Sequence, residues 1–424
     1  MSTQLQTTWR WASLDEGNDR WRVLANAVRG EAVRLLADEY AGRLRAIILT
    51  GSLARDEATV VEKEGRWKCL GDAEFLLVFE ERNRMPATSE LEPLLRQIEA
   101  RLEQRNIFCH VVAGACRADG LSKFRPSIFV HELRTQGEVV WGDVKILSLL
   151  PGFSASDIPR EDAWQMLCNR MIEQLEVMAE SKPDTEAIVH VQYRAVKLYL
   201  DMATSLLVFF GAYQPTYRER AEHLRLVAEK GSAQDFPFSL QVFANRVAAC
   251  TQFKLQESVA WDADAPEIVA DFGFLNEALL YAKHLWRWEL ARLADSSDQL
   301  PECQLLERWM RLQPMRKRLR GWLYLLRARG RHWGWRNWQR WLRLARRASP
   351  RYCVYAAASR LFSGLPATQD SSAAPLNAKV DWDEARSWLP VFTGPRTNGE
   401  SETWQRLATE IAWNYHQFLE GTQA

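Results

Sequence analysis

Two short apolar runs near the amino terminus constrain the fold of this chain most. RAIILTG (45–51) and AEFLLVFEE (73–81) have the length and composition of buried β-strands. A charged excursion over 59–71 separates them, and we expect the two strands to be neighbours in one sheet. Gly51 and Ser52 end the first strand, whereas Asp72 and Glu74 open the second.

The surrounding segments predict a mixed α+β domain over 1–150. Helical spacing of Leu24, Val28, Val33 and Leu36 predicts a helix over 18–44, and 89–105 predicts another. NIFCHVVAG (106–114), SIFVHELRT (127–135) and VVWGD (139–143) are typical of further strands. The fold class expected is therefore α+β, a mixed sheet with helices followed by helical regions.

The remainder of the chain is predicted to be helical. With 424 residues the chain exceeds the roughly 250 residues that one core supports. Helical periodicity predicts a bundle over 151–298 and a basic Trp- and Arg-rich helical region over 299–424. A low-complexity stretch near 363–378 is typical of a linker.

Composition narrows the setting of the protein. No apolar run approaches the roughly 18 residues of a membrane span, and the first residues do not resemble a secretory signal. We therefore expect a cytoplasmic protein. The seven cysteines are scattered without a CxxC motif, which favours reduced buried thiols over disulfides or a structural metal.

The residues between the two apolar strands carry the chemistry. Asp72 and Glu74 are two positions apart on a strand, so their side chains project to the same face. Two adjacent carboxylates need a cation to stay ionised, and Mg²⁺ is the expected one. Gly51 and Ser52 offer backbone N–H groups and a hydroxyl to phosphate, and Arg55 adds charge. A metal beside a phosphate cradle indicates phosphoryl or nucleotidyl transfer.

This pattern resembles the DNA polymerase beta-like nucleotidyltransferase superfamily. The likeness lies in GSLARDE (51–57) and in Asp72-x-Glu74, although Asp56 stands where the motif has glycine. The resemblance implies that Ser52 binds the triphosphate of an NTP, ATP above all, and that Asp72 and Glu74 bind Mg²⁺, up to two ions. It also implies a third carboxylate on a later strand, and Glu132 is the candidate, as metal ligand or as base.

The helical bundle resembles the HEPN-like domains that accompany such heads. Tyr193, Lys197 and Asp201 share one helix face, and Lys197 is either a nucleotide phosphate partner or one half of a surface pair with Asp201. Arg218 and His223 fit the RxxxxH pattern of HEPN ribonucleases, a short motif in an arginine-rich chain.

Two histidines lie on the predicted strands. Strand alternation places His131 on the face opposite Glu132, where we expect it to pack, and leaves the place of His110 undecided.

The net charge of +1 conceals one strongly basic segment. Residues 308–347 contain fourteen Arg and Lys and no acid, so the rest of the chain carries 1 − 14 = −13. Gly330 and Gly334 predict two helices rather than one. In the second, Trp338, Trp341, Leu342 and Ala345 would share a face.

Three roles remain open for this segment. It binds nucleic acid, it lies on an anionic membrane surface, or it packs on the body with its arginines paired to acids.

The resulting hypothesis is a Mg²⁺-dependent nucleotidyltransferase that moves an NMP, AMP above all, to an acceptor that the sequence does not identify. The alternative is a catalytically degenerate head that binds nucleotide or nucleic acid, in a regulatory or toxin-antitoxin-like setting. A HEPN-type ribonuclease is a third. A complete triad of Asp72, Glu74 and Glu132 would favour the enzyme.

Overall fold

The computed structural model describes residues 10–11, 14–63, 65–180, 185–230, 236–255, 272–297, 299–364, 382–391 and 400–419. The chain forms two compact units. Unit 1 comprises 1–159, 211–223 and 248–265, and unit 2 comprises 160–210, 224–247 and 266–424. The predicted boundary at 150 lies near this division, but two later segments join unit 1, and the residues after 299 belong with the bundle.

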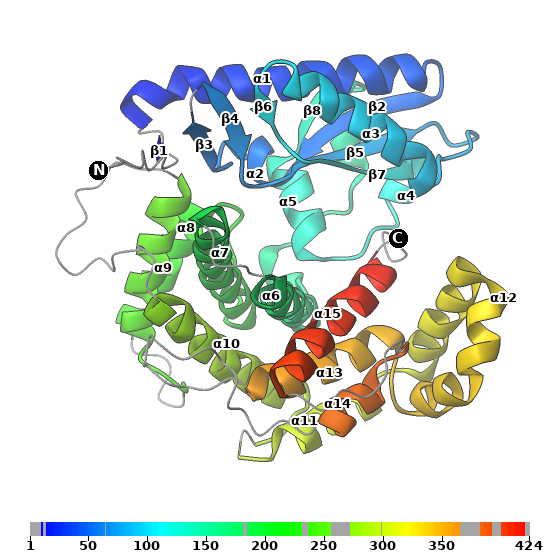
Figure 1. The fold of residues 1–424 in the computed structure, drawn as a ribbon. Coiled ribbons are helices and arrows are strands. Elements are labelled where there is room, and N and C mark those ends of the chain that lie inside the picture. The colour runs from blue at the N-terminus through cyan, green and yellow to red at the C-terminus, as the bar shows by residue number, and fades with distance from the viewer. Residues whose placement is uncertain are drawn as a thin grey trace, which may run out of the picture. The chain divides into compact units, whose positions relative to one another are not determined.

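A four-stranded sheet with the strand order β7-β5-β2-β8 forms the centre of unit 1 (Figure 1). Its strands are β2 (Leu44–Thr50), β5 (Ala73–Phe79), β7 (Val111–Arg117) and β8 (Glu138–Gly142). β2 runs antiparallel to β5 and β8, while β5 is parallel to β7. The two apolar runs are therefore hydrogen-bonded neighbours, as the sequence predicts.

The charged excursion between these strands belongs to a second sheet with the order β1-β3-β4-β6. Its strands are β1 (Arg10–Trp11), β3 (Val60–Lys63), β4 (Arg66–Cys69) and β6 (Ile107–Phe108). The helices of the same part of the chain are α1 (Leu14–Glu39), α2 (Gly51–Ala54), α3 (Thr88–Glu103), α4 (Ala118–Leu121) and α5 (Ile128–Gln136), with short 3₁₀ turns η1 (Ile146–Leu149) and η2 (Ala155–Asp157).

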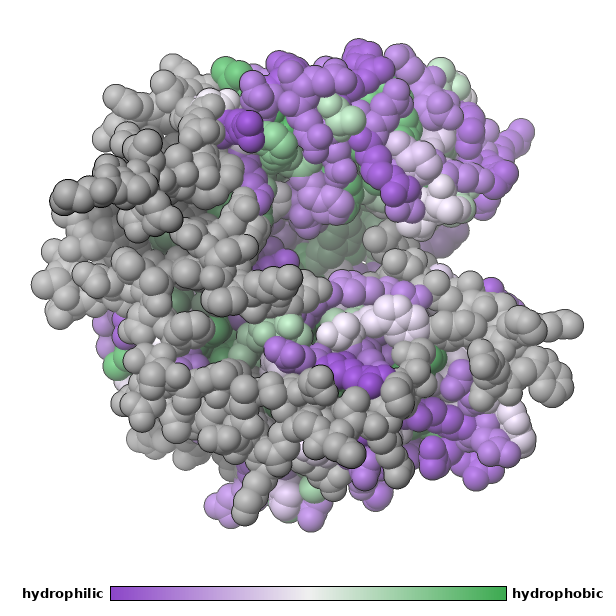
Figure 2. Space-filling model, in the orientation of Figure 1, coloured by the Kyte–Doolittle hydropathy of each residue, from purple (hydrophilic) through white to green (hydrophobic). Residues whose placement is uncertain are grey.

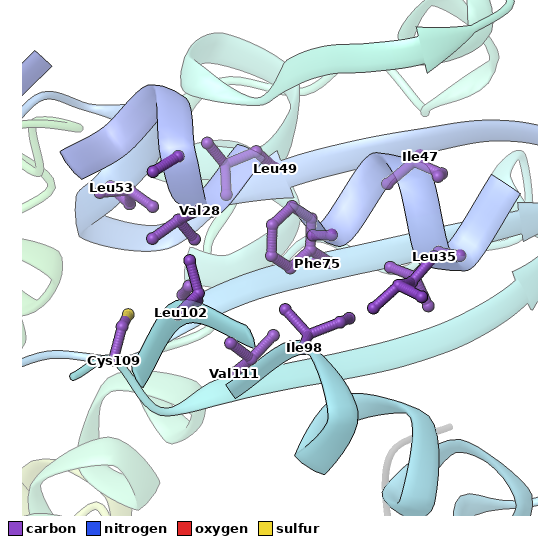
Figure 3. Packing of buried hydrophobic residues seen from close by; sticks show 14 of the residues in the cluster. Val28, Leu35, Ile47, Leu49, Leu53, Phe75, Ile98, Leu102, Cys109 and Val111 are labelled. Carbon is purple, nitrogen blue, oxygen red and sulfur yellow. The ribbon is translucent and has the colours of Figure 1, made fainter. Parts of the chain in front are cut away.

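Alternating side chains of the central sheet enter two different cores. Phe75 and Leu77 face a cluster built with α1 and α3, which includes Val28 and Ile98 (Figure 3). Leu76 and the residues in phase with it face a second cluster that includes residues of α4 and α5. The outer surface over α1 and α3 is mostly hydrophilic (Figure 2). Because both faces are covered, the strands are continuous apolar runs rather than alternating ones.

The predicted strand over 127–135 is wrong, because this segment forms the helix α5. Ser127 is its N-cap and its side chain accepts a hydrogen bond from the backbone N–H of Val130. Val130 and Leu133, one helical turn apart, are buried on the sheet side, whereas Phe129 is exposed. The β-branched residues suggested a strand, but the serine cap and this spacing favour a helix. Glu132 therefore lies on a helix.

Unit 2 is helical, and the whole is an α+β protein, as predicted. Two helices, α8 (Tyr217–Glu229) and α9 (Leu240–Leu255), have residues in both units. The others are α6 (Arg160–Glu180), α7 (Thr185–Phe209), α10 (Phe272–Leu293), α11 (Glu302–Leu312), α12 (Met315–Arg347), α13 (Pro350–Ser363), α14 (Trp382–Trp388) and α15 (Glu400–Leu419). None of the described helices combines the length and the apolar character needed to cross a bilayer.

The predicted linker near 363–378 lies mostly outside the described residues. The seven cysteines are free thiols, and five of them are buried.

Helix α12 doubles back on itself (Figure 1). In a straight helix Trp322 and Trp341 would be about 28 Å apart at 1.5 Å per residue. Their ring centroids lie 5.7 Å apart, and the indole N–H of Trp322 donates to the carbonyl of Ala348 at 2.9 Å. Arg318 likewise donates to the carbonyl of Arg346 at 3.1 Å. The segment is one helical run rather than the two helices that the glycines predicted, and its two halves form antiparallel legs.

Candidate functional site

The two halves of the predicted site meet at one edge of the central sheet. β2 ends where the antiparallel strand β5 begins, and Thr50 is paired with Glu74 in the register. Gly51 follows with a φ of +72°, a left-handed conformation that glycine adopts readily. A Cβ atom at this position would lie 2.6 Å from Oε1 of Glu74 and 2.8 Å from its Cδ. The carboxylate of Glu74 therefore lies directly against the backbone of Gly51.

Glu74 lies on the face of the sheet that carries α5, and Asp72 directly precedes β5. Phe75 and Leu77 belong to the core under α1 and α3, whereas Leu76 belongs to the other core, and Glu74 is in phase with Leu76. Asp72, just before β5, is exposed, while Glu74 is partly buried. The strand therefore presents two carboxylates in succession, with the deeper one beside the Gly51 turn.

Ser52 lies in α2, a single helical turn of four residues, and is partly exposed. Asp56, which ends this turn, has a φ of +56°. That left-handed conformation explains why glycine suits this position of the motif, and Asp is one of the few other residues that adopt it readily.

Arg55 is buried in an ion pair, contrary to its predicted position on a triphosphate. Its side chain is 4% exposed, and it donates to Oε2 of Glu57 at 2.8 Å and to Oε2 of Glu132 at 2.6 Å. Its guanidinium also lies over the ring of Tyr217, 5.3 Å from the centroid. Burial alone would lower the pKa of Arg55, but Glu132 and its other neighbours raise it. The charge of Arg55 is thus used within the protein.

Glu132 occupies the centre of this buried group. Its Oε2 accepts from Arg55, and its Oε1 accepts from Arg220 and from the hydroxyl of Tyr213 at 2.5 Å. Burial would raise the pKa of Glu132, but the cations Arg220 and Arg55 outweigh this and lower it. Both oxygens therefore serve protein donors, which argues against Glu132 as a metal ligand.

Glu132 as the third ligand therefore stays a prediction, and its hydrogen bonds to Arg55, Tyr213 and Arg220 do not favour it. In the described part of the chain, no group of three or more His, Cys, Asp or Glu side chains is placed to hold a metal ion. Asp72 and Glu74 remain as the carboxylates of the candidate site.

Five further residues complete the buried group, and the sequence predicts a role for none of them. Besides the hydrogen bond to Glu132, Arg220 donates to the carbonyl oxygens of Gln214 and Pro215 at 2.7 and 2.8 Å. Glu57 accepts from the backbone N–H of Tyr217 at 2.7 Å. We call Arg55, Glu57, Glu132, Tyr213, Tyr217, Arg220 and Lys254 the ion cluster.

Lys254 brings a second distant segment to the ion cluster. Its ammonium lies 5.8 Å from the ring centroid of Tyr217, and its carbonyl accepts from the hydroxyl of Thr59 at 3.0 Å. Burial lowers the pKa of Lys254. The ion cluster therefore connects residues 211–223 and 248–265 to the first part of unit 1. Glu57 and Tyr217, for example, are 160 residues apart in the sequence.

The two histidines have local partners. His110 is exposed, and its Nδ1 lies 2.7 Å from Oε1 of Glu99. His131 packs edge-on against Tyr213, with ring centroids 5.5 Å apart, and burial lowers its pKa. His131 is therefore a packed residue as expected, but on a helix.

Of the residues predicted in the helical bundle, Tyr193, Lys197 and Asp201 belong to unit 2, whereas Arg218 and His223 belong to unit 1. Lys197, on α7 in unit 2, has its ammonium 5.7 Å from the ring centroid of Tyr193. Asp201 forms a partly buried ion pair with Arg170 at 2.5 Å. Arg218 is exposed, and Nε2 of His223 lies 3.3 Å from Nε2 of Gln214. Arg220, two positions after Arg218, is the buried arginine of this helix.

Comparison of the chain with protein-family models, curated proteins and solved structures finds no significant match. The geometry of the site therefore has to carry any statement about function.

Proposed function

We propose that the sheet edge formed by Gly51, Ser52, Asp72 and Glu74 binds a Mg²⁺-nucleoside triphosphate and transfers its NMP to an acceptor, with release of pyrophosphate. The observation that supports this is the contact between the Gly51 backbone and the Glu74 carboxylate, which brings the phosphate-binding turn and the carboxylate strand to one place. ATP is the donor that the sequence resemblance implies, and the proposal keeps the cytoplasmic location expected from the sequence.

The residues present fit a single Mg²⁺ ion. Mg²⁺ is bound in proteins by one or two carboxylates together with water and substrate phosphates. Glu74 on β5 and Asp72 directly before it supply two carboxylates, and Asp72 is exposed to solvent. When bound, the ion would neutralise the phosphates and polarise the phosphorus that is attacked. A second ion has no remaining carboxylate among the predicted ligands.

The chain itself would position the nucleotide. The left-handed turn at Gly51 leaves the backbone open where a side chain would collide with Glu74, and Ser52 offers a hydroxyl beside it. Glu74 would be held in place by this packing, while Asp72 is free to adjust to the ligand because it is exposed. The general base is not assigned to Glu132, since its oxygens accept from two arginines.

The second candidate is a nucleotide-binding regulatory module without transfer activity. The engagement of Glu132 favours it, because the sequence argument for an enzyme relied on a complete triad. A HEPN-type ribonuclease has less support, since the buried arginine of α8 is Arg220 and not Arg218 of the motif.

Binding of a fluorescent ATP analogue, with and without Mg²⁺, tests the site. We expect Asp72→Asn and Glu74→Gln each to weaken Mg²⁺-dependent binding at least about tenfold, as loss of a metal ligand does. Glu80→Gln/Glu81→Gln is the matched control, because it removes two exposed carboxylates at the opposite end of β5. This control should bind like the wild type.

Incubation with labelled NTPs and cell extract then separates the two candidates. Mg²⁺-dependent binding with label transfer supports the transferase, and binding without transfer supports the module. Equal binding by the wild type and the Asp72→Asn variant would contradict both.

A further inference from the structure

The α12 hairpin exposes apolar side chains along its first leg. Met315, Leu319, Leu323 and Leu326 recur every three or four residues, and their exposed fractions lie between 39% and 66%. Single exposed aliphatic residues are common on protein surfaces, but a row of four on one helix face is an apolar patch of the kind found at interaction sites.

The second leg repeats the pattern. Trp338 and Leu342, one turn apart, are 53% and 50% exposed. The expected shared face of Trp338, Trp341, Leu342 and Ala345 is therefore divided. Trp341 is buried against Trp322 and donates to the carbonyl of Pro390 at 2.9 Å, while Trp338 and Leu342 face outward.

Both apolar rows lie on the same side of the hairpin. The legs meet through Trp322 and Leu325 on one and Trp341 and Leu344 on the other, all buried. At about 100° per residue, the exposed row of each leg is rotated roughly 90° from this seam in the same helical sense. Because the legs are antiparallel, equal rotations bring the two rows to one side. The hairpin thus has one continuous apolar side, which we call the apolar face.

Arginines border the apolar face. Arg316, Arg320 and Arg327 follow the row of the first leg, and Arg343 and Arg346 follow that of the second, all exposed. Within the part of the chain that the structure describes, none of these five arginines forms an ion pair with a carboxylate. The ion pairs of the hairpin are made by Lys317 with Glu161 and by Arg347 with Glu307. Packing of this segment on the body of the protein therefore explains why Trp322 and Trp341 are buried. It does not explain the five arginines, which are exposed to solvent.

We propose that the apolar face of the α12 hairpin docks on an anionic lipid bilayer surface. Apolar side chains bordered by arginine, without an acid from 308 to 347, are the features of a helix that lies in the headgroup region. Binding of single-stranded nucleic acid would instead use exposed aromatic rings for stacking. Here Trp322 and Trp341 are buried, and among the hairpin side chains that the structure describes the exposed large apolar ones comprise five aliphatic residues and two aromatic ones, Tyr324 and Trp338.

Co-sedimentation of the full chain with phosphatidylcholine vesicles, with and without phosphatidylglycerol, tests the proposal. We expect binding to the anionic vesicles to exceed binding to neutral ones by about tenfold or more, and to fall as salt rises from about 0.1 M to about 0.5 M.

Two variants separate the apolar and the charged contributions. Leu319→Ser/Leu323→Ser and Arg316→Gln/Arg320→Gln should each weaken partitioning into anionic vesicles by about tenfold. All four residues are exposed, so both variants should keep the wild-type circular dichroism spectrum.

The matched controls are Val23→Ser/Val144→Ser and Arg82→Gln/Arg96→Gln, which change exposed residues of unit 1 and should leave partitioning within about twofold of wild type. Equal binding to neutral and anionic vesicles would overturn the proposal. Binding that needs the arginines but not the leucines would also overturn it and would indicate a site for a soluble polyanion such as RNA.

Discussion

Replacing Glu132 with glutamine tests whether this residue stabilises the fold or binds metal. The ion cluster contains three cations, Arg55, Arg220 and Lys254, and two carboxylates, Glu57 and Glu132. The substitution would leave one carboxylate for three cationic side chains, two of which are 4% exposed. We therefore expect Glu132→Gln to destabilise unit 1.

The magnitude follows from the loss of a buried partner. Removing one member of a buried ion pair costs about 3–5 kcal/mol, because the remaining charge is uncompensated. Glutamine retains one oxygen that can accept from Arg55 or Tyr213, so we expect about 3 kcal/mol. The double variant Glu132→Gln/Arg220→Gln should cost less than the sum of the two single changes, since both remove the same interaction.

Hydrogen exchange is the appropriate assay, because a chain with two compact units need not unfold in one transition. Amides of α5 and of 217–223 should exchange faster in Glu132→Gln, in parallel with a lower urea midpoint for unit 1. The matched control is Glu138→Gln, which breaks a partly exposed pair with Arg29 and should cost no more than about 1 kcal/mol.

The pH dependence provides a second measurement of the same effect. The folded-state pKa of Glu132 is lowered from 4.5, so its contribution to the free energy of unfolding is present above about pH 4.5. It is lost as the pH falls through the lowered value, and the difference between the wild type and Glu132→Gln should then shrink. If Glu132→Gln is no less stable than Glu138→Gln and binds Mg²⁺-nucleotide as poorly as Asp72→Asn, Glu132 is a metal ligand and the reasoning is wrong.

Three further changes test the local structure. Gly51→Ala should lower the free energy of unfolding by about 1–2 kcal/mol because of its positive φ, and by more because the added methyl group collides with Glu74. In thermal unfolding, the double change Gly51→Ala/Glu74→Ala should recover the stability lost to the collision but not the stability lost to the positive φ. Asp56→Gly should be neutral or stabilise by up to about 1 kcal/mol, whereas Asp56→Val, with the same φ of +56°, should destabilise in urea titrations. Burial lowers the pKa of His131 from 6.5, so the unfolded chain takes up the proton first and stability is lost as the pH falls below 6.5. His131→Phe should lack that part of the loss when stability is measured between about pH 7.5 and 5.5. An equal loss in the variant would show that another group is responsible.

The sheet edge could be predicted from the sequence because its determinants are local. Each apolar run is long enough for one strand, and the short excursion between them favours an antiparallel neighbour. Once β2 and β5 pair, the residues that end one strand and begin the other necessarily meet. Their pairing in the register needs no information from elsewhere in the chain.

The position of Glu132 could not be predicted in the same way. A short apolar segment with Ile128 and Val130 is compatible with either a strand or a helix by its periodicity, and the Ser127 cap decides between them. The helix that carries Glu132 still packs on the face of the sheet to which Glu74 belongs. What determines its role is the arrival of Arg220 from a helix 88 residues later, a long-range contact that no local pattern signals.

The α12 hairpin shows a further limit of reading periodicity. Both the buried seam and the apolar face consist of apolar residues at helical spacing. The sequence therefore predicts an amphipathic segment but does not show which apolar residues are buried and which are exposed. The reversal that brings Trp322 onto Trp341 makes the division, because it buries one row and turns Leu319 and Leu342 outward. The five arginines at the outer border form no ion pair with a carboxylate among the residues that the structure describes, and they are exposed. The exposed arginines of this segment are therefore available to an anionic surface, whereas Trp322 and Trp341 are enclosed in the seam.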